Sequence, residues 1–105
     1  AQLDPQGRLF GYLDVVEAGR LAGWALAAGD AQPLALELLV NGQRVAATRA
    51  ETPREDVGRA DARFHARCGF EFLPSEGAVW RRGDRVEVRV AGTEVHLVNS
   101  PGTVG

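Results

Sequence analysis

Two largely apolar stretches near the start of the chain, residues 9–16 and residues 21–26, have the lengths and residue types of β-strands. Positions of odd and even number would lie on opposite faces of each strand, and the first strand has mixed faces. Ala18-Gly19 lies between them and is typical of a turn. The pattern therefore predicts two short strands joined by a tight turn. The second strand carries Trp24 to one face.

The most apolar run covers residues 34–40 and is interrupted only by Glu37. Leu, Ala and Glu are good helix formers, so a buried helix is an alternative. The run is short for a helix, and it ends on Asn41-Gly42, the favoured pair of a two-residue type I′ hairpin. Residues 43–50 alternate again after this pair. We therefore predict a strand, a hairpin turn and a second strand.

Three further alternating stretches complete the predicted strands. Residues 84–90 are the clearest, with Val86, Val88 and Val90 on one face. About seven strands at short, regular spacing are typical of a sandwich. The sequence thus predicts an all-β, immunoglobulin-like antiparallel β-sandwich. The two remaining strands are predicted at residues 68–73 and 93–98. The expected division of the chain is a lead-in at 1–8, the sandwich domain at 9–100 and a tail at 101–105.

Residues 51–67 are the least regular part of the chain and are rich in arginine. Thr52-Pro53 followed by Glu55 and Asp56 resembles an N-cap, a proline at the first position and an acidic first turn. A single helical turn around residues 54–59 is therefore predicted. Long loops in compact domains are often functional, which makes this segment a candidate site.

Composition narrows the classes of function. The chain has 105 residues, the size of one domain, and a formal net charge of −2. All twelve of its cationic side chains are arginines, mixed among fourteen acidic residues. This balance leaves no basic footprint for nucleic acid. No apolar run approaches the roughly 18 residues of a membrane span. The many Arg, Ala, Gly and Val residues suggest a GC-rich bacterial genome.

The sequence contains a single cysteine, Cys68, and no methionine. One cysteine cannot form an internal disulfide, so it does not indicate a compartment. The absence of methionine, even at the first position, predicts either a processed product or, the alternative that we favour, a piece of a longer polypeptide.

Two aromatic residues are candidate ligand contacts. Trp24 lies between Gly23 and Ala25 within a strand, so we expect it to fill the core between two sheets. Trp80 lies in a loop beside Arg81 and Arg82, which predicts an exposed site because aromatic and Arg side chains are common interface anchors. The alternative, which we favour for Trp80 taken alone, is simple packing over the end of the sandwich.

Arg54 and Asp56 are the other candidate binding residues. They could bind a ligand from the long loop. The structural alternative, which the residue types favour, has Asp56 accepting backbone N–H groups and Arg54 clamping the loop by a bidentate pair to a carboxylate such as Asp14.

Catalytic and metal chemistry have little support in the sequence. His65 and Cys68 lie at a metal-ligand spacing, but zinc needs three or four ligands and the only other histidine is His96. A Cys–His nucleophile would also need a stabilising oxyanion hole, and no motif supplies one. The carboxylates lack the spacing of a calcium loop. We therefore expect no enzyme activity, no metal and no cofactor.

The order of several short motifs resembles a family of bacterial immunoglobulin-like β-sandwich modules. The motifs in this chain are Gly11-Tyr12-Leu13-Asp14, Gly23-Trp24-Ala25, Val40-Asn41-Gly42, Arg54-Glu55-Asp56-Val57, Gly69-Phe70 and Asp84-Arg85-Val86-Glu87-Val88. The resemblance covers roughly residues 11–100. One departure is Glu55, where the family pattern has proline, so the loop can be set differently here.

Modules of this kind are accessory units of larger proteins that handle glycans or lie at the cell surface. The resemblance therefore implies a non-catalytic role and favours a secreted or cell-surface location, but it does not assign a ligand. Our first hypothesis is a binding module that contacts carbohydrate weakly through loop residues such as Trp80, Arg81 and Arg82. The other domains of a parent protein are expected partners. The alternative is a structural spacer, or a protein–protein or dimerisation domain without a sugar site.

Overall fold

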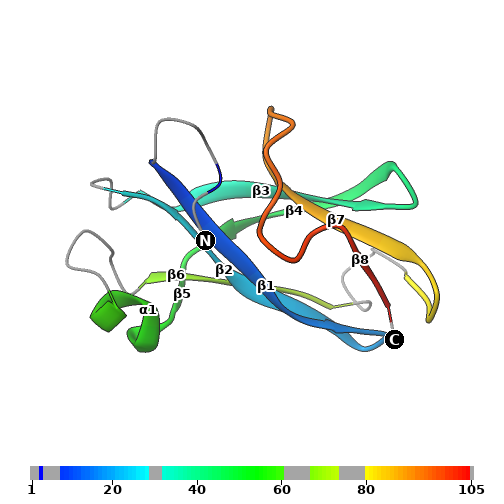
Figure 1. Ribbon diagram of the computed structural model, residues 1–105, viewed down its shortest axis with the longest axis horizontal. Helices are drawn as coiled ribbons and strands as arrows, with labels where there is room; N and C mark the ends of the chain where they lie inside the picture. Colours follow the sequence, from blue (N-terminus) through cyan, green and yellow to red (C-terminus); the bar gives the residue numbers. More distant parts are fainter. Residues whose placement is uncertain (1–2, 4–7, 29–31, 61–66, 74–79, 105) are drawn as a thin grey trace.

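The chain folds into a sandwich of two antiparallel sheets, seen in a computed structural model that describes residues 3, 8–28, 32–60, 67–73 and 80–104 (Figure 1). The predicted all-β sandwich is confirmed, and these ranges contain eight strands where about seven were expected. Sheet A has the order β1 (Leu9–Glu17), β2 (Arg20–Ala27), β6 (Arg67–Phe72) and β5 (Thr52–Pro53). Sheet B has the order β4 (Gln43–Ala50), β3 (Leu34–Val40), β7 (Arg85–Val90) and β8 (Gly102–Thr103).

The β3–β4 connection is the predicted two-residue hairpin. Asn41 has a φ of 51° and Gly42 a φ of 85°. Both angles lie in the left-handed region that a type I′ turn requires, which asparagine and glycine tolerate best. Val40 pairs with Gln43 directly before and after the turn. The hairpin is confirmed, and it excludes the helix considered for residues 34–40.

The inner face of sheet A is built around positions that have no room for a side chain. A Cβ atom on Gly23 would lie 2.1 Å from the carbonyl oxygen of Tyr12 and 3.1 Å from the Phe70 ring. A Cβ atom on Gly11 would lie 2.7 Å from Cδ2 of Leu97. Phe70 and Leu97, both buried, therefore fill the core where β1 and β2 have no side chains.

This packing places Trp24 on the outer face of sheet A, and not in the core between the two sheets where it was expected. Leu21, buried in the core, shares its strand and face with Gly23, so Trp24 points to the other face of sheet A. Trp24 is only partly buried there, and it packs against a second, smaller apolar cluster. The prediction of a core tryptophan at this position is wrong, because the small residues Gly23 and Ala25 hold the inward positions beside it.

The second cluster lies on the outer side of sheet A, beneath the helix α1 (Glu55–Ala60). Its buried members are Phe10, Leu26, Val57 and Cys68. The helix confirms the predicted turn at residues 54–59. Thr52 and Pro53 pair with β6 as a strand instead of capping the helix. No helix in the described residues is long and apolar enough to cross a membrane.

A segment near the C-terminus joins the two sheets along one side. The N–H of Leu97 donates to the Val88 carbonyl in sheet B (3.0 Å). The N–H of Leu13 in sheet A donates to the carbonyl of the next residue, Val98 (2.9 Å). The predicted strand at 93–98 is wrong, because His96 and Val98 make only isolated bridges, to Arg89 and Tyr12. Residues 97 and 98 serve different sheets, so they cannot continue one ladder.

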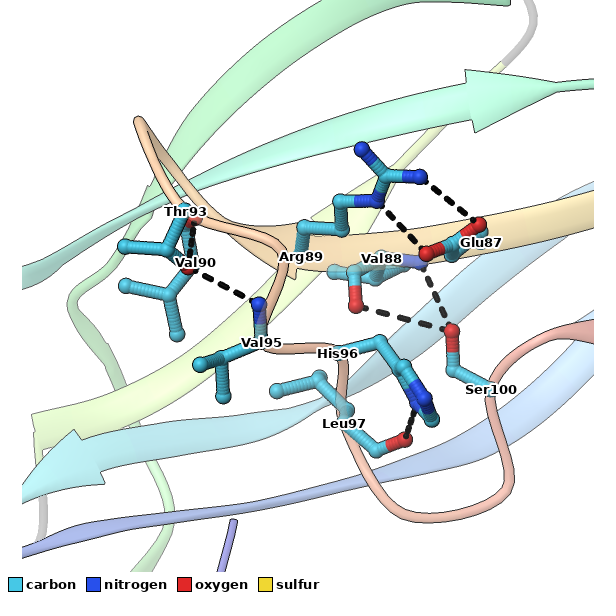
Figure 2. A network of polar contacts seen from close by, with 9 residues as sticks. All are labelled: Glu87, Val88, Arg89, Val90, Thr93, Val95, His96, Leu97 and Ser100. Atoms are coloured by element: carbon cyan, nitrogen blue, oxygen red, sulfur yellow. Dashed lines mark hydrogen bonds and ion pairs between the residues drawn. The ribbon is translucent and has the colours of Figure 1, made fainter. Parts of the chain in front are cut away.

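Ser100 anchors the segment around Leu97 and Val98 to β7 by a buried hydrogen bond (Figure 2). It is buried, and its hydroxyl accepts a hydrogen bond from the Val88 N–H at 2.9 Å. The residues beyond it also belong to the fold. Gly102 pairs with Val86 in β8, and Val104 is buried in the core. The stretch expected to be a tail therefore contributes both a strand and a core residue.

Replacing Gly23 with alanine tests the close approach inside sheet A. The added Cβ would overlap the Tyr12 carbonyl, which is backbone and cannot rotate away. We expect the free energy of unfolding to fall by about 2–3 kcal/mol, measured by chemical denaturation. Gly19→Ala is the matched control, because nothing lies within 4 Å of its Cβ position. Its effect should stay within about 0.5 kcal/mol, and equal losses for the two variants would contradict the account.

Candidate functional site

Trp80 is a structural residue in this fold. Its side chain is 3% exposed and belongs to the main core. Its indole Nε1–H donates to the Glu17 carbonyl at 2.8 Å, at the end of β1. The predicted exposed site at Trp80 is wrong, and the packing alternative describes what the residue does. A buried indole with a satisfied N–H has no free face for a ligand.

Arg81 and Arg82 lie in the turn before β7, and both are exposed as predicted. Asp84 holds this turn, because its carboxylate accepts from the Arg81 N–H (2.8 Å) and from the Asn41 amide (3.2 Å). These hydrogen bonds, with the Arg81 N–H the strongest, lower the pKa of Asp84. The turn therefore has a defined shape, but its two arginine side chains do not converge with a second predicted site residue.

Arg54 is the centre of a charged cluster on the outer side of sheet A. Its Nη1 donates to Oδ2 of Asp14 at 2.7 Å, which confirms the predicted partner. The bidentate pair is made with Asp56 instead, from Nε at 3.1 Å and Nη2 at 3.0 Å. The hydrogen bonds to Asp56 and then Asp14 raise the pKa of Arg54, so the guanidinium stays charged. Arg54 thus ties β1 to the start of α1.

Two local features place this cluster. At a β-bulge in β1, Asp14 and Val15 together oppose Ala22, which leaves Asp14 exposed on the outer face. On β6, a Cβ atom on Gly69 would lie 2.7 Å from Cγ of Arg54. The aliphatic stem of Arg54 therefore lies directly over Gly69, and its head reaches toward β1.

Tyr12 and Trp24 are two aromatic side chains of this face; Tyr12 was not among the candidate site residues predicted from the sequence, and Trp24 was expected in the core. They are cross-strand partners between β1 and β2, and Trp24 also pairs with Gly69. Tyr12 is 39% exposed, and Trp24 is partly buried. Because paired residues share a face, Tyr12, Trp24 and the stem of Arg54 lie in adjacent positions across the sheet. The sequence does carry a signal for their outward position. Gly11 precedes Tyr12 and Gly23 precedes Trp24, and two neighbouring residues of a strand point to opposite faces.

The predicted site residues therefore separate into two groups. Arg54 and Asp56 lie at α1, whereas the Trp80–Arg82 turn lies at the opposite end of the long axis of the molecule (Figure 1). The group at α1 has an exposed aromatic neighbour, Tyr12. The group before β7 has no exposed aromatic side chain, because Trp80 is buried in the core. The outer face of sheet A, comprising Tyr12, Trp24, Asp14, Arg54 and Asp56, is accordingly the candidate site, and we call it the aromatic face.

Among the described residues, Cys68 and His96 do not lie together as a zinc site or a Cys–His nucleophile would require. Cys68 is buried, and burial raises the pKa of its thiol to about 11, which disfavours the nucleophilic thiolate. The His96 ring lies within 3.1 Å of the Leu97 carbonyl, beside sheet B (Figure 2). His65 lies outside the described residues. Within these residues, no group of three or more His, Cys, Asp or Glu side chains could hold a metal ion.

The outer face of sheet B carries paired charges. Arg89 donates to Glu87 at 2.6 Å (Figure 2), and Arg44 lies 3.0 Å from Glu37. The bond from Arg89 lowers the pKa of Glu87. A shallow hollow here is lined by Asn41, Gly42, Arg85, Glu87 and Arg89. It holds no aromatic side chain and offers charge without a stacking surface.

Comparison with known proteins gives no match to a family model, to a curated protein or to a solved structure.

Replacing Arg54 with methionine tests the charged cluster through the titration of Asp56. Methionine keeps an aliphatic stem over Gly69 and removes the guanidinium. In the native protein, the hydrogen bond from Arg54 holds the pKa of Asp56 below its ordinary value of 3.8. The pairing therefore stabilises the fold above this value, and the stabilisation is lost as the pH falls through the lowered pKa. In the variant we expect the pKa to return toward 3.8, measured by NMR titration of the carboxyl carbon.

Arg59→Met is the control for this titration. Arg59 is an exposed residue of α1 that pairs with Glu55, so its removal should leave the pKa of Asp56 unchanged. The same shift in both variants would mean that the general charge of the helix, and not the Arg54 pair, sets the pKa.

Replacing Trp80 with phenylalanine tests its structural role. The variant keeps an aromatic ring in the core and leaves the Glu17 carbonyl without its donor. We expect the free energy of unfolding to fall by about 1–3 kcal/mol, and by about 3–5 kcal/mol for Trp80→Ala. Thermal and chemical denaturation measure both. A Trp80→Phe variant as stable as the native protein would contradict the assignment.

Proposed function

We propose that this chain is an immunoglobulin-like, non-catalytic accessory module that binds carbohydrate on the aromatic face. One observation carries the proposal. An exposed tyrosine and a half-buried tryptophan lie side by side on a sheet, next to an arginine held between two carboxylates. An aromatic ring offers a flat apolar surface to a sugar ring, and the polar groups beside it can fix the sugar's orientation by hydrogen bonds.

The rigidity of the face supports this use. Arg54 is held by both neighbouring aspartates and lies on Gly69, so its head is fixed before any ligand arrives. Tyr12 sits in a β1 strand that is bonded on one side to β2 and on the other to the bridging segment at Val98. A site built on strands in this way loses little conformational entropy on binding. The site proposed here uses sheet residues where the sequence favoured loop residues.

The spacer or dimerisation alternative needs a large apolar patch. Among the described residues, the exposed large hydrophobic side chains are Tyr12, at 39%, and Val45, at 37%. They lie on β1 of sheet A and β4 of sheet B, so they do not form one patch. This arrangement favours the binding module over an assembly surface. The buried Cys68 thiol, with its raised pKa, is poorly suited to act as a nucleophile.

Replacing Tyr12 with alanine tests the proposal directly. Because Tyr12 is exposed, its loss should leave the fold intact while it removes the stacking surface. We expect at least about a tenfold loss of affinity, equivalent to about 1.4 kcal/mol, for whichever oligosaccharide the native domain binds on a broad glycan array. Titration calorimetry then measures the affinity of each variant.

Val45→Ala is the matched control, since it removes a side chain of similar exposure from the other sheet. It should bind like the native domain. A folded native domain that binds no glycan on the array would contradict the proposal. So would a Tyr12→Ala variant that binds as tightly as the native domain. Concentration-dependent dimerisation of a silent domain would favour the assembly role.

A further inference from the structure

The charges beside the aromatic pair limit the class of ligand that the face can accept. All three nitrogens of the Arg54 guanidinium already donate to Asp14 or Asp56. One cation between two carboxylates leaves this cluster with one net negative charge. The next ion pair on sheet A, Arg20 with Glu71, is neutral as a pair. The cluster therefore offers no uncommitted cation to an acidic sugar.

An acidic ligand would have to displace an aspartate from Arg54 or lie close to an unbalanced carboxylate. Both outcomes are unfavourable, because like charges repel and an aspartate released from Arg54 loses charge-assisted hydrogen bonds. Sugars with a carboxylate, a sulfate or a phosphate therefore match this cluster poorly. A neutral sugar avoids both costs.

The same cluster has an acceptor that suits a neutral sugar. Arg54 binds Oδ2 of Asp14, and Oδ1 makes no hydrogen bond within the described residues. The Asp14 side chain is one-third exposed and follows Tyr12 by two residues on the same face. A sugar hydroxyl is a hydrogen-bond donor, and a carboxylate oxygen is a strong acceptor for it. A pyranose ring stacked on Tyr12 would bring its hydroxyl groups toward this oxygen.

We propose that the ligand of the aromatic face is a neutral pyranose glycan, which stacks on Tyr12 and donates a hydroxyl hydrogen bond to Oδ1 of Asp14. Acidic glycans are rejected by the paired charges of the cluster. This inference rests on the proposed carbohydrate-binding function, and it adds the class of sugar and a residue that selects it.

One nearby cation could support the opposite preference. Arg67 lies two residues before Gly69 on β6, is exposed and has no ion pair within the described residues. If the face bound an acidic glycan, Arg67 would be its natural partner. Arg67→Gln therefore separates the two classes, because it should not change the affinity for a neutral glycan.

The test compares glycans that differ only in charge. Oligomers of glucose, mannose and galactose are titrated into the native domain, each beside the corresponding uronic acid oligomer with a carboxylate at C6. We expect at least one neutral oligomer to bind, and its uronic counterpart to bind at least about tenfold more weakly. Raising the salt from about 0.1 M to about 1 M shortens the Debye length from roughly 10 Å to 3 Å, and it should leave the neutral affinity unchanged.

Variants connect this preference to the named residues. Asp14→Ala should weaken neutral binding at least about tenfold, whereas Asp14→Asn, which keeps an acceptor oxygen, should lose about threefold or less. In both variants the pKa of Asp56 should stay low, because its bidentate bond to Arg54 remains. That readout shows that the cluster is still in place when affinity changes.

The failures are distinguishable. Tyr12-dependent binding of a uronic oligomer in preference to its neutral counterpart, abolished by high salt or by Arg67→Gln, would overturn the inference and leave the binding module standing. Equal affinities for the two members of each pair would also overturn it. If no member of either series binds, and the glycan array is silent as well, the proposed function itself fails and the inference fails with it.

Discussion

Three positions at which a side chain cannot fit organise this molecule. A Cβ atom at Gly23 would lie 2.1 Å from the backbone of β1, and one at Gly11 would lie 2.7 Å from Leu97. These inner positions leave the core to be filled by Phe70 and Leu97. Because strand residues alternate, Tyr12 and Trp24 must then face outward. The third position, Gly69, seats the stem of Arg54 on the same outer face at 2.7 Å. Core and candidate site therefore follow from one constraint.

The outward face is made specific by electrostatics. Arg54 joins Asp14, carried on a bulge of β1, to Asp56 in the first turn of α1. These residues are far apart in sequence, and their ionic hydrogen bonds hold the head of Arg54 beside the aromatic pair. At such exposure the pairs contribute little to stability. Their greater effect is to fix the charges, and hence the hydrogen-bonding groups, that a ligand would meet.

Much of the fold could be predicted from the sequence, because it depends on local signals. Alternating residues gave most of the strands, and Asn41-Gly42 gave the hairpin. The strand expected at 93–98 failed because Leu97 bonds to one sheet and its neighbour Val98 to the other, which is a tertiary arrangement without a local pattern. Likewise, β8 adds only two residues to sheet B, too short a stretch for alternation to be read.

The candidate site was predicted in part. The pair of Arg54 with Asp14 was expected from the preference of guanidinium groups for carboxylates, and it is present. The strand position of Trp24 suggested that it lies in the core, which is wrong. The loop position of Trp80 made it a candidate ligand contact, although packing was the favoured alternative, and packing is what the structure shows. Whether a strand residue is buried depends on which face of the strand points into the core. Gly23 marks the inward face next to Trp24, but this can be recognised only when its neighbours Tyr12 and Phe70 are known.

The most direct measurement is an NMR titration of the domain with a neutral oligosaccharide that it binds. A two-dimensional spectrum follows the chemical shifts of the indole N–H signals of the two tryptophans. The account predicts that the Trp24 signal shifts with ligand concentration, because this indole lies on the aromatic face. The Trp80 signal should stay in place, because its N–H is bonded to the Glu17 carbonyl inside the fold. Movement of the Trp80 signal with a stationary Trp24 signal would contradict the account and place binding at the opposite end of the molecule.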